Sequence, residues 1–492
     1  MKKGKVYLIG AGPGYPGYLT LRGHQLLQRS DVVLYDHLIG KPILNLIPDS
    51  AEQIYVGKHG SKHRYKQKEI NDMIVDLATE GKTVARLKGG DSFLFGRGAE
   101  EILAIEAEGI AFEVVPGIPS PTSVSLLGGI PLTCRNKSSS IHIYTGHFRA
   151  GGKLDFDYKA MVNTGGTMVF LMSLGNMREI AAGLMAAGLD PDTKAAAIME
   201  GSQPGQRKVL APLHQLCDAM EAANFVSPVL ILVGAVCDYS EQLDWFTKRP
   251  LFGKRYLVTR VEDTPGRLTS LLEEEGAVVD HFATVEYNAL SFVIPEKFDY
   301  LVFTSPRAVD TFMTAFLQDR DLRSLGGIKI AVLGDRTGAR LEKYHLRPDY
   351  ISSHPTGRAL AENLAAACQG ENPDLVLEKG KTMLLPRSAG GSTEINKILS
   401  PYYDLIDLHL YTVRPLEFAG DISGYDQLLF TSASAVRGFS KLNMQGKPAL
   451  CIGEITAQAA KELGMDITVA REASLESMVE TLVAQESIIK QK

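Results

Sequence analysis

Short apolar runs that are typical of buried strands alternate with helical patterns along the whole chain. In its first part these runs lie at Val6–Ile9, Asp31–Tyr35, Thr83–Leu87 and Phe112–Val115. Strands that are separated by helices predict an α/β fold built on parallel sheets. Because open sheets of this kind bind ligands beyond the carboxyl ends of their strands, we expect the functional residues there.

A second series of apolar runs begins after Pro116-Gly117, at Ile141–Tyr144, Met168–Leu171 and Pro228–Val233. The break between the two series predicts a first domain, residues 1–240, of two α/β lobes. We place these lobes at about 1–116 and 117–240. The polar, irregular stretch that follows predicts a linker at 241–250, and a new strand at Tyr256–Thr259 opens a second domain over 251–492.

The second domain contains an internal duplication. The segment Leu301–Val309 (LVFTSPRAV) matches Leu428–Val436 (LLFTSASAV). A related strand and turn follow each copy, at Ile330–Thr337 and Ala449–Thr456. An internal repeat of this size predicts two similar lobes.

Length and composition limit the kind of protein. At 492 residues the chain is about three times the usual domain size, so several domains are expected. A net charge of -5 argues against a general nucleic-acid binder. The longest apolar run, Val229–Val236, is far shorter than the roughly 20 residues that a membrane span needs, and the amino-terminal apolar stretch is too short for a signal-peptide core. We expect a cytoplasmic protein without a membrane partner.

The cysteines form no motif. The five thiols are widely scattered, without a CxxC pair or a spacing that indicates a zinc site or a disulfide framework: Cys134, Cys217, Cys237, Cys368 and Cys451. We expect buried, reduced thiols and no metal cofactor.

Gly10-Ala11-Gly12-Pro13-Gly14 follows the first strand and is the first of three candidate ligand loops. Glycines permit tight turns and a close approach of the backbone to a ligand. The segment lacks the last glycine of the dinucleotide fingerprint, because Tyr15 stands there, and Pro13 removes a backbone N–H that a pyrophosphate would use. An NAD-dependent dehydrogenase is therefore disfavoured.

The second loop, Leu87–Asp91, leads to Phe95–Gly98, and the third is Val115–Ser123. With Gly129–Arg135 and Gln203–Arg207, these segments resemble the uroporphyrinogen-III C-methyltransferase family over about residues 4–240. The resemblance implies two α/β lobes that bind S-adenosylmethionine between them, in a tetrapyrrole-methylase fold.

The resemblance also implies roles for single residues. The expected cofactor contacts are Pro13, Gly89, Gly90, Asp91, Leu94, Pro119, Ser120, Met172 and Gly201. Asp36 matches the family's proton acceptor and Lys58 its proton donor. The alternatives are a helix cap for Asp36, a solvated lysine for Lys58 and a core methionine for Met172. A positioned carboxylate suits the chemistry, because a proton must leave the macrocycle after methylation.

An acidic protein must hold a substrate with eight carboxylates by local cations. Residues 58–68 are densely basic, although such a run is often only a solvated loop. Arg97 and Arg135 are the stronger candidates, because a planar guanidinium pairs bidentately with a carboxylate. Three positions depart from the family pattern, namely Tyr15 for an acidic residue, Pro119 for a threonine and Cys134 for a histidine.

The second domain resembles uroporphyrinogen-III synthase from about residue 251 to the end. The resemblance rests on the paired Phe-Thr-Ser strands, the Gly-x-x-Thr turns and a tyrosine near the return crossover. It implies two lobes joined by a hinge, an outer lobe at 251–286 plus 412–492 and an inserted lobe at 287–411. The implied reaction is cyclisation of hydroxymethylbilane with loss of water.

Candidate residues of the second domain follow from the same resemblance. Tyr411 matches the family's tyrosine and is the candidate acid, although packing at the hinge is an equal alternative. Hydroxyls that follow strands can bind carboxylates or cap helices: Ser305, Thr337, Ser432, Ser434 and Thr456.

The leading hypothesis is a bifunctional enzyme that makes uroporphyrinogen III and methylates it twice to precorrin-2, for sirohaem or cobalamin synthesis. A second hypothesis makes the carboxy-terminal domain a non-catalytic, tetrapyrrole-binding regulator. A methyltransferase for a later corrinoid intermediate is a third hypothesis, against which the full motif set and the fused synthase argue. The resemblance also implies a homodimer through the methyltransferase half.

Overall fold

The computed structural model describes residues 3–59, 62–63, 65–146, 156–260, 266–352, 354 and 356–491. The chain forms two compact units. One contains Met1–Tyr256, Gly266–Asp280 and Leu475–Lys492, and the other contains Leu257–Pro265 and His281–Ser474. Among the described residues no helix has both the length and the apolar character to cross a membrane.

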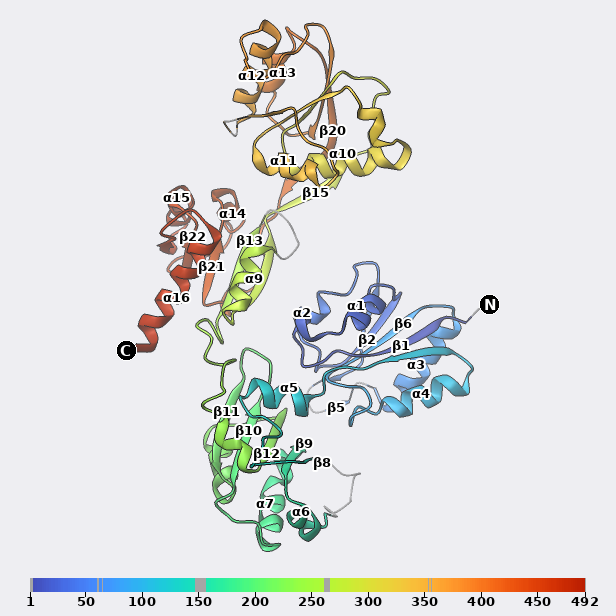
Figure 1. The fold of residues 1–492 in the computed structure, drawn as a ribbon, viewed down its shortest axis with the longest axis vertical. Coiled ribbons are helices and arrows are strands. Elements are labelled where there is room, and N and C mark those ends of the chain that lie inside the picture. The colour runs from blue at the N-terminus through green and yellow to red at the C-terminus, as the bar shows by residue number, and fades with distance from the viewer. Residues whose placement is uncertain are drawn as a thin grey trace. The chain divides into compact units, whose positions relative to one another are not determined.

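The first sheet is fully parallel, as the sequence predicts, and has the strand order β3-β2-β6-β1-β7. Its strands are β1 (Lys5–Gly10), β2 (Val32–Tyr35), β3 (Glu52–Tyr55), β6 (Val84–Lys88) and β7 (Ala111–Val115). Because β1 lies between β6 and β7 and all three are parallel, the loops that follow these strands emerge at the same end of the sheet. Figure 1 shows β1 and β6 side by side in this lobe.

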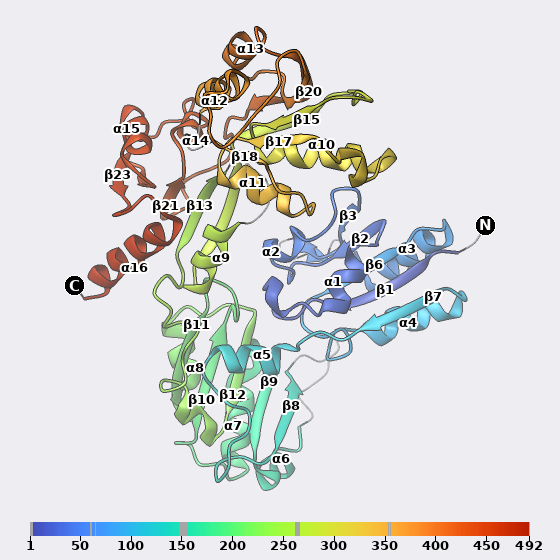
Figure 2. The same cartoon turned by 45° about the horizontal axis from the view of Figure 1, so that its top comes forward.

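Side chains that alternate along these strands build a core on each face of the sheet. One core combines Val6 and Leu8 with residues of α3 (Gln67–Thr79) and α4 (Gly98–Ala107). The other combines Ile9 with residues of α1 (Leu21–Leu27) and α2 (Lys41–Leu44). Figure 2 labels α3 and α4 in this lobe, where Gln67 of α3 donates to Glu101 of α4. The helices leave the carboxyl ends of the strands to the loops.

The second sheet is mixed, and the expectation of parallel sheets is wrong for it. Its order is β11-β10-β12-β9-β8, and β10 pairs antiparallel with both β11 and β12. Only residues 200–206 connect β10 to β11, whereas a parallel crossover needs a dozen residues or more. The strands are β8 (Ile141–Thr145), β9 (Thr167–Leu171), β10 (Lys194–Met199), β11 (Arg207–Pro212) and β12 (Val229–Val233).

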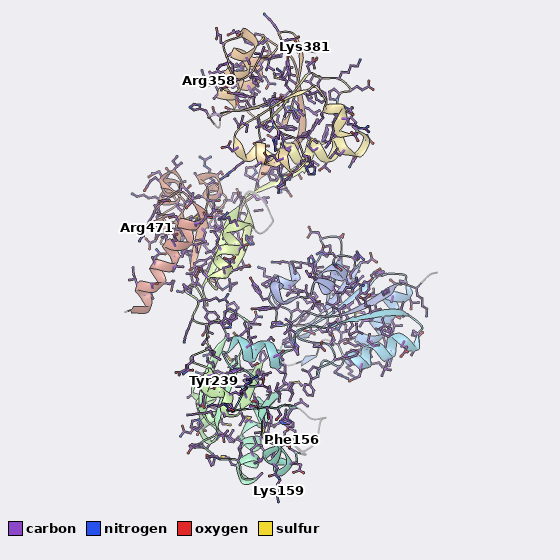
Figure 3. All side chains as sticks on the ribbon, in the orientation of Figure 1. Phe156, Lys159, Tyr239, Arg358, Lys381 and Arg471 are labelled. Carbon is purple, nitrogen blue, oxygen red and sulfur yellow. The ribbon has the colours of Figure 1, made fainter. Side chains whose placement is uncertain are left out.

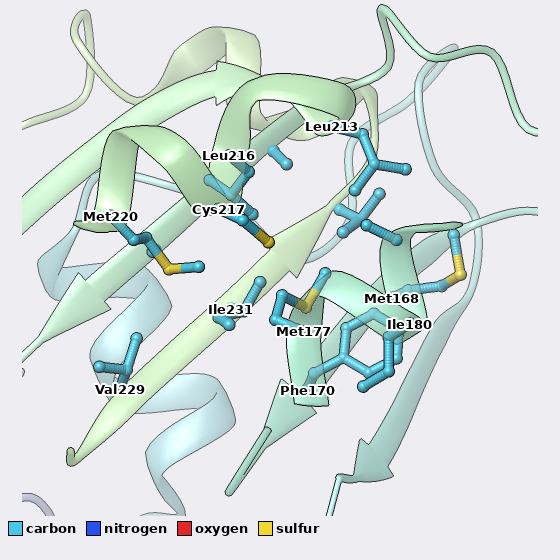
Figure 4. Close-up of a cluster of buried hydrophobic side chains, with 14 of the residues drawn as sticks. Met168, Phe170, Met177, Ile180, Leu213, Leu216, Cys217, Met220, Val229 and Ile231 are labelled. Atoms are coloured by element: carbon cyan, nitrogen blue, oxygen red, sulfur yellow. The ribbon is translucent and has the colours of Figure 1, made fainter. Parts of the chain in front are cut away.

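An apolar core covers one face of this second sheet (Figure 4). Phe170 and Ile231 from the strands pack with Met177 of α7 (Met177–Ala186) and Met220 of α8 (Leu216–Ala222). The other face packs on Val124 of α5 (Ser120–Leu127). Helix α5 continues directly from the third candidate loop. Its packing on the second sheet therefore ties that loop to the second lobe.

The second half of the chain contributes two further sheets. One has the order β14-β13-β21-β22-β23 and the other β15-β20-β19-β16-β17-β18. Their strands are β13 (Arg255–Arg260), β14 (Val278–Ala283), β15 (Val285–Ala289), β16 (Tyr300–Phe303), β17 (Lys329–Val332), β18 (Tyr350–Ile351), β19 (Thr382–Ser388), β20 (Asp404–Pro415), β21 (Gln427–Phe430), β22 (Pro448–Cys451) and β23 (Asp466–Val469). The long strand β20 pairs antiparallel with β15 and parallel with β19. The domain bounds given above stay predictions.

The structure confirms the internal duplication. Ser305 caps α10 (Pro306–Asp319) by accepting the N–H of Ala308, and Ser432 caps α14 (Ala433–Arg437) by accepting the N–H of Ala435. The backbone angles of the two serines nearly coincide, at φ -157 and ψ 151 for Ser305 and φ -161 and ψ 153 for Ser432. The repeated Thr-Ser therefore encodes one local structure twice, a strand followed by a capped helix.

Candidate functional site

The three candidate loops of the first domain meet at the carboxyl ends of the strands of its parallel sheet. Gly12 and Gly90 exchange backbone hydrogen bonds of 3.1 and 2.8 Å. A Cβ placed on Gly117 would lie 2.1 Å from the carbonyl oxygen of Gly90, and one on Gly10 would lie 2.5 Å from the nitrogen of Gly117. Only glycine permits this approach, which explains why the three motifs occur together in the sequence.

Asp91 fastens this junction. One of its carboxylate oxygens accepts the N–H of Phe93 at 2.8 Å, and the other accepts the N–H of Gly117 at 3.0 Å. Charge-assisted bonds of this kind are the stronger ones in proteins. Asp91 thus joins the second loop to the third, and its predicted contact with the cofactor stays a prediction.

Gly90 lies close to two other predicted cofactor contacts. It has a φ of +67, and a Cβ there would point toward Pro119 and Ser120, 3.6 Å from the Ser120 nitrogen and 3.8 Å from the Pro119 Cα. These are ordinary van der Waals distances, so a methyl group at this position would lie against the third loop. The fold thus brings Gly90, Pro119 and Ser120 together, and their contact with the cofactor stays a prediction.

Met172 is not a core residue. It follows β9, its side chain is 52% exposed and its φ is +52, a conformation that is uncommon for a side chain of this size. Backbone strain of this kind persists where surrounding structure enforces it, often at binding sites. The core alternative is therefore wrong, while the predicted cofactor contact stays a prediction.

Gly201 and Leu94 are two further predicted cofactor contacts, and each lies in a loop. Gly201 lies between Glu200 and Ser202, whose φ values of +50 and +73 form a tight turn. The Ser202 hydroxyl donates to the carbonyl of Pro13, so this turn touches the first glycine loop. Leu94 is partly buried within the second loop.

Asp36 begins a chain of charged groups that runs into the protein. Its Oδ1 accepts the N–H of Leu38 at 3.0 Å, and its Oδ2 lies 3.4 Å from Nη2 of Arg86. Helix α2 begins only at Lys41, so Asp36 closes a local turn and does not cap that helix. With Oδ1 used by the backbone, Oδ2 is the oxygen beside the guanidinium.

Glu101 holds the inner end of this network. Its side chain is wholly buried, and its Oε1 lies 3.4 Å from Nε of Arg86 and 3.0 Å from Nζ of Lys88. Gln67 donates to the same oxygen at 3.1 Å. Burial, together with the Arg86 cation, lowers the pKa of Lys88. Two carboxylates and two cations thus form a neutral set that connects α4 to the predicted base.

The predicted substrate cations lie at exposed positions. Arg97 forms two hydrogen bonds with Glu100, of 2.9 and 2.6 Å, and this contact raises the pKa of Arg97. Arg135 is exposed and lines a hollow of about 570 Å³ formed by residues 133–139. Lys58 is the first residue of β4 (Lys58–His59), but its side chain lies outside the described residues, as do those of 59–64.

Two of the departures from the family pattern have clear surroundings. Partial burial raises the pKa of Tyr15 to about 12, so its phenol stays protonated and cannot act as an acidic residue. Cys134 lies with its Sγ 3.7 Å from the hydroxyl of Tyr239, which is labelled in Figure 3. Lys137 approaches the same ring at 5.4 Å from its centroid. Pro119, the third departure, precedes α5 and provides no side-chain cap.

In the second half, Tyr411 lies at the centre of a cluster on the six-stranded sheet. Its hydroxyl lies 3.1 Å from Oγ of Ser305, and its ring meets that of Tyr287 edge-on, with centroids 5.5 Å apart. The guanidinium carbon of Arg307 lies 3.6 Å from the centroid of Tyr287. Ser305 thus caps α10 and also contacts the Tyr411 hydroxyl, while its binding of a substrate carboxylate stays a prediction.

The other predicted hydroxyls have mostly local partners. The Thr337 hydroxyl donates to the Leu333 carbonyl at 3.0 Å and is buried. Thr456 is also buried, while Ser432 and Ser434 lie 3.0 Å apart at the start of α14. These side chains lie at the starts of helices. Their binding of substrate stays a prediction.

Sequence reasoning missed three residues, namely Arg86, Glu101 and Arg307. Arg307 had a signal, because it occupies the place in the first repeat that Ser434 occupies in the second. Glu101 and Arg86 had none, since their importance depends on a contact between a strand and a helix. Among the described residues no group of three or more His, Cys, Asp or Glu side chains could hold a metal ion.

Comparisons with known proteins match the two halves of the chain to two different families. A family model described as tetrapyrrole (corrin/porphyrin) methylases matches residues 5–217, and one described as uroporphyrinogen-III synthase HemD matches residues 266–480. The porphyrin biosynthesis protein HemD of Ruminiclostridium josui is 36% identical over 98% of both chains. The siroheme synthase of Hydrogenovibrio crunogenus is 43% identical over 49% of this chain and 51% of that protein, so the likeness spans about half of its length.

Solved structures resemble the first half. The uroporphyrin-III C-methyltransferase of Thermus thermophilus shares 37% identity and covers 48% of this chain and 99% of its own, with a TM-score of 0.41. A second structure of that enzyme, in complex with S-adenosyl homocysteine, shares 38% identity with the same TM-score. The relative that aligns over nearly the whole chain shows that this protein belongs to the family of porphyrin biosynthesis enzymes in which a tetrapyrrole methyltransferase precedes a uroporphyrinogen-III synthase.

Proposed function

We propose that the chain converts hydroxymethylbilane to uroporphyrinogen III in its second half and methylates this product twice to precorrin-2 in its first half. Two observations together carry the proposal. The methylase and synthase family models match the chain in this order, and one relative matches it over 98% of its length. The regulatory alternative for the second half is not favoured, because the synthase model spans residues 266–480.

S-adenosylmethionine would supply the methyl group, held by the loops around Gly90, Pro119 and Ser120. The related methyltransferase that was solved with S-adenosyl homocysteine supports this choice. Each methylation would join a ring carbon of the macrocycle to the methyl group as the bond from sulfur to that methyl breaks and S-adenosyl homocysteine leaves, and a proton must then leave the macrocycle. Asp36 would accept that proton at Oδ2, the oxygen that lies 3.4 Å from Nη2 of Arg86. Holding the two reacting carbons in line would supply much of the remaining acceleration.

The cyclisation removes the terminal hydroxyl of the linear tetrapyrrole as water and joins the last ring to the first after inversion. Tyr411 would donate a proton to the departing hydroxyl, and the Oγ of Ser305, 3.1 Å away, would orient the phenol. The expected carboxylate contacts of Arg97 and Arg135, and of Ser432, Ser434, Thr337 and Thr456, belong to this proposal. Dimerisation through the methyltransferase half, a cytoplasmic location and the use of the product for sirohaem or cobalamin also remain predictions.

The test is to incubate the purified protein with freshly generated hydroxymethylbilane, with and without S-adenosylmethionine, and to identify the oxidised products by chromatography and mass spectrometry. We expect isomer III without the cofactor and a dimethylated product with it. Formation of isomer I alone, the spontaneous product, would contradict the synthase activity. Unmethylated isomer III in the presence of the cofactor would contradict the methyltransferase activity.

A further inference from the structure

Arg307, in the second half of the chain, has no ion-pair partner among the described residues. It is the second residue of α10 and lies two positions after the capping Ser305. Its Nε is buried and has no hydrogen-bond partner, and no carboxylate of the described residues pairs with its guanidinium. Leaving a buried donor unsatisfied costs free energy, so such a group in a native structure requires an explanation.

Neighbouring charged residues on the same helix do not provide a partner for Arg307. Asp310, one turn further along α10, is occupied by Arg340 at 2.6 Å and by the Tyr344 hydroxyl at 3.1 Å. Arg320, at the end of the helix, donates to the carbonyls of Ile294 and Pro295. Each of these arginines has oxygen partners, and Arg307 differs from both.

The guanidinium is nevertheless held in place. Its carbon lies 3.6 Å from the centroid of the Tyr287 ring, a distance at which the flat cation lies on the ring face. Tyr287 in turn meets Tyr411 edge-on, with an interplanar angle of 80°. Stacking occupies one face of the guanidinium and leaves its in-plane N–H edge for an acceptor, which is the geometry that matches a carboxylate.

We propose that Arg307 binds a side-chain carboxylate of the linear tetrapyrrole and so holds the substrate beside Tyr411. This inference rests on the proposed synthase activity, whose substrate carries eight carboxylates. The ring of Tyr287 couples the two groups, because it contacts both the guanidinium and the Tyr411 ring. An anchored carboxylate would fix the position of the attached pyrrole relative to the Tyr411 hydroxyl.

The test compares Arg307→Gln and Arg307→Lys with the wild-type chain, using freshly generated hydroxymethylbilane and following formation of isomer III. Loss of one charge-assisted contact should raise KM by about 10- to 100-fold in Arg307→Gln. Arg307→Lys keeps the charge but loses the planar fork, so its KM should lie between those of Arg307→Gln and the wild type. The control is Arg323→Gln, which removes a guanidinium whose side chain is 91% exposed and pairs with its neighbour Asp321.

The outcomes separate this inference from the proposed function. If the wild-type chain forms only isomer I, the synthase activity itself fails. If the wild type forms isomer III and both Arg307 variants keep its KM, Arg307 does not bind substrate. A fall in kcat without a change in KM would overturn the inference as well. Thermal unfolding of each variant shows whether it folds, and Arg307→Lys decides the question if Arg307→Gln does not.

Discussion

Nη2 of Arg86 lies 3.4 Å from Oδ2 of Asp36, and Nε of the same guanidinium lies 3.4 Å from Oε1 of Glu101. The buried Arg86 thus connects the partly exposed carboxylate of Asp36, which follows β2, with the wholly buried carboxylate of Glu101 on α4. Arg86 contacts Asp36 and Glu101 contacts Arg86, so we expect both to act as positioning residues for Asp36.

Replacing Asp36 by asparagine should lower kcat for methylation of supplied uroporphyrinogen III by about 10² to 10⁴, the usual contribution of general-base catalysis. Binding of S-adenosyl homocysteine, measured by calorimetry, should change little. Asp72→Asn is the matched control, since Asp72 is exposed and pairs with Lys68 on the surface of α3. An Asp36→Asn enzyme with wild-type kcat would remove Asp36 from the mechanism.

Glu101→Gln should destabilise the first lobe locally by about 3 to 5 kcal/mol, because it leaves two buried cations with one carboxylate. The double variant Glu101→Gln/Lys88→Met restores the charge balance and should recover most of this loss. Hydrogen exchange of β6 and α4 measures the effect without assuming that the multidomain chain unfolds in one step. Equal protection in the single and double variants would contradict the electrostatic explanation.

Gly90→Ala tests the predicted cofactor contact at Gly90. The variant should lose at least ten-fold in affinity for S-adenosyl homocysteine, because its methyl group would point toward Pro119 and Ser120. Gly109→Ala is a matched control, since its φ of +62 resembles the +67 of Gly90 and nothing lies within 4 Å of the added Cβ. Both variants carry a backbone cost of roughly 1 to 2 kcal/mol, so only the difference in affinity reports on the site.

Tyr411→Phe should lower kcat for isomer III formation by about 10-fold or more, as expected when a general acid is removed. Methylation of supplied uroporphyrinogen III should continue at the wild-type rate, which shows that the first half is intact. Tyr402→Phe, which removes a hydroxyl bonded to Gln369 at 2.6 Å, serves as the control. An unchanged kcat would leave Tyr411 with a packing role only.

A pH-dependent contribution to stability is expected at Glu113 on β7. A hydrogen bond from Arg22, supported by Lys5, lowers the pKa of Glu113 from about 4.5 to about 2. Because the folded protein holds this proton less tightly than the unfolded chain, the stabilisation is present above pH 4.5 and is lost as the pH falls toward 2. The difference in thermal midpoint between the wild type and Glu113→Gln should shrink over that window and also in high salt. A difference that is independent of pH would contradict this assignment.

The sequence alone determined the apolar strands that it named, the glycine loops and the duplication, but strands such as β10 and β11 were not among them. Apolar runs of strand length, glycines at strand ends and Thr-Ser before a helix are local signals, because each reflects the conformation of a few consecutive residues. The pattern around Asp36 and Tyr411 was also sufficient to select them, through the resemblance to two families.

Tertiary structure decided what these residues touch. The antiparallel pairing of β10 depends on a short connection and on neighbours far along the chain, so apolar runs alone did not reveal it. The same holds for Glu101, which reads as one of two adjacent glutamates on an amphipathic helix. Its burial against Arg86 and Lys88, like the stacking of Arg307 on Tyr287, arises only when strands and helices pack. Local sequence encodes the elements, and the contacts between distant elements create the charged networks that the chemistry would use.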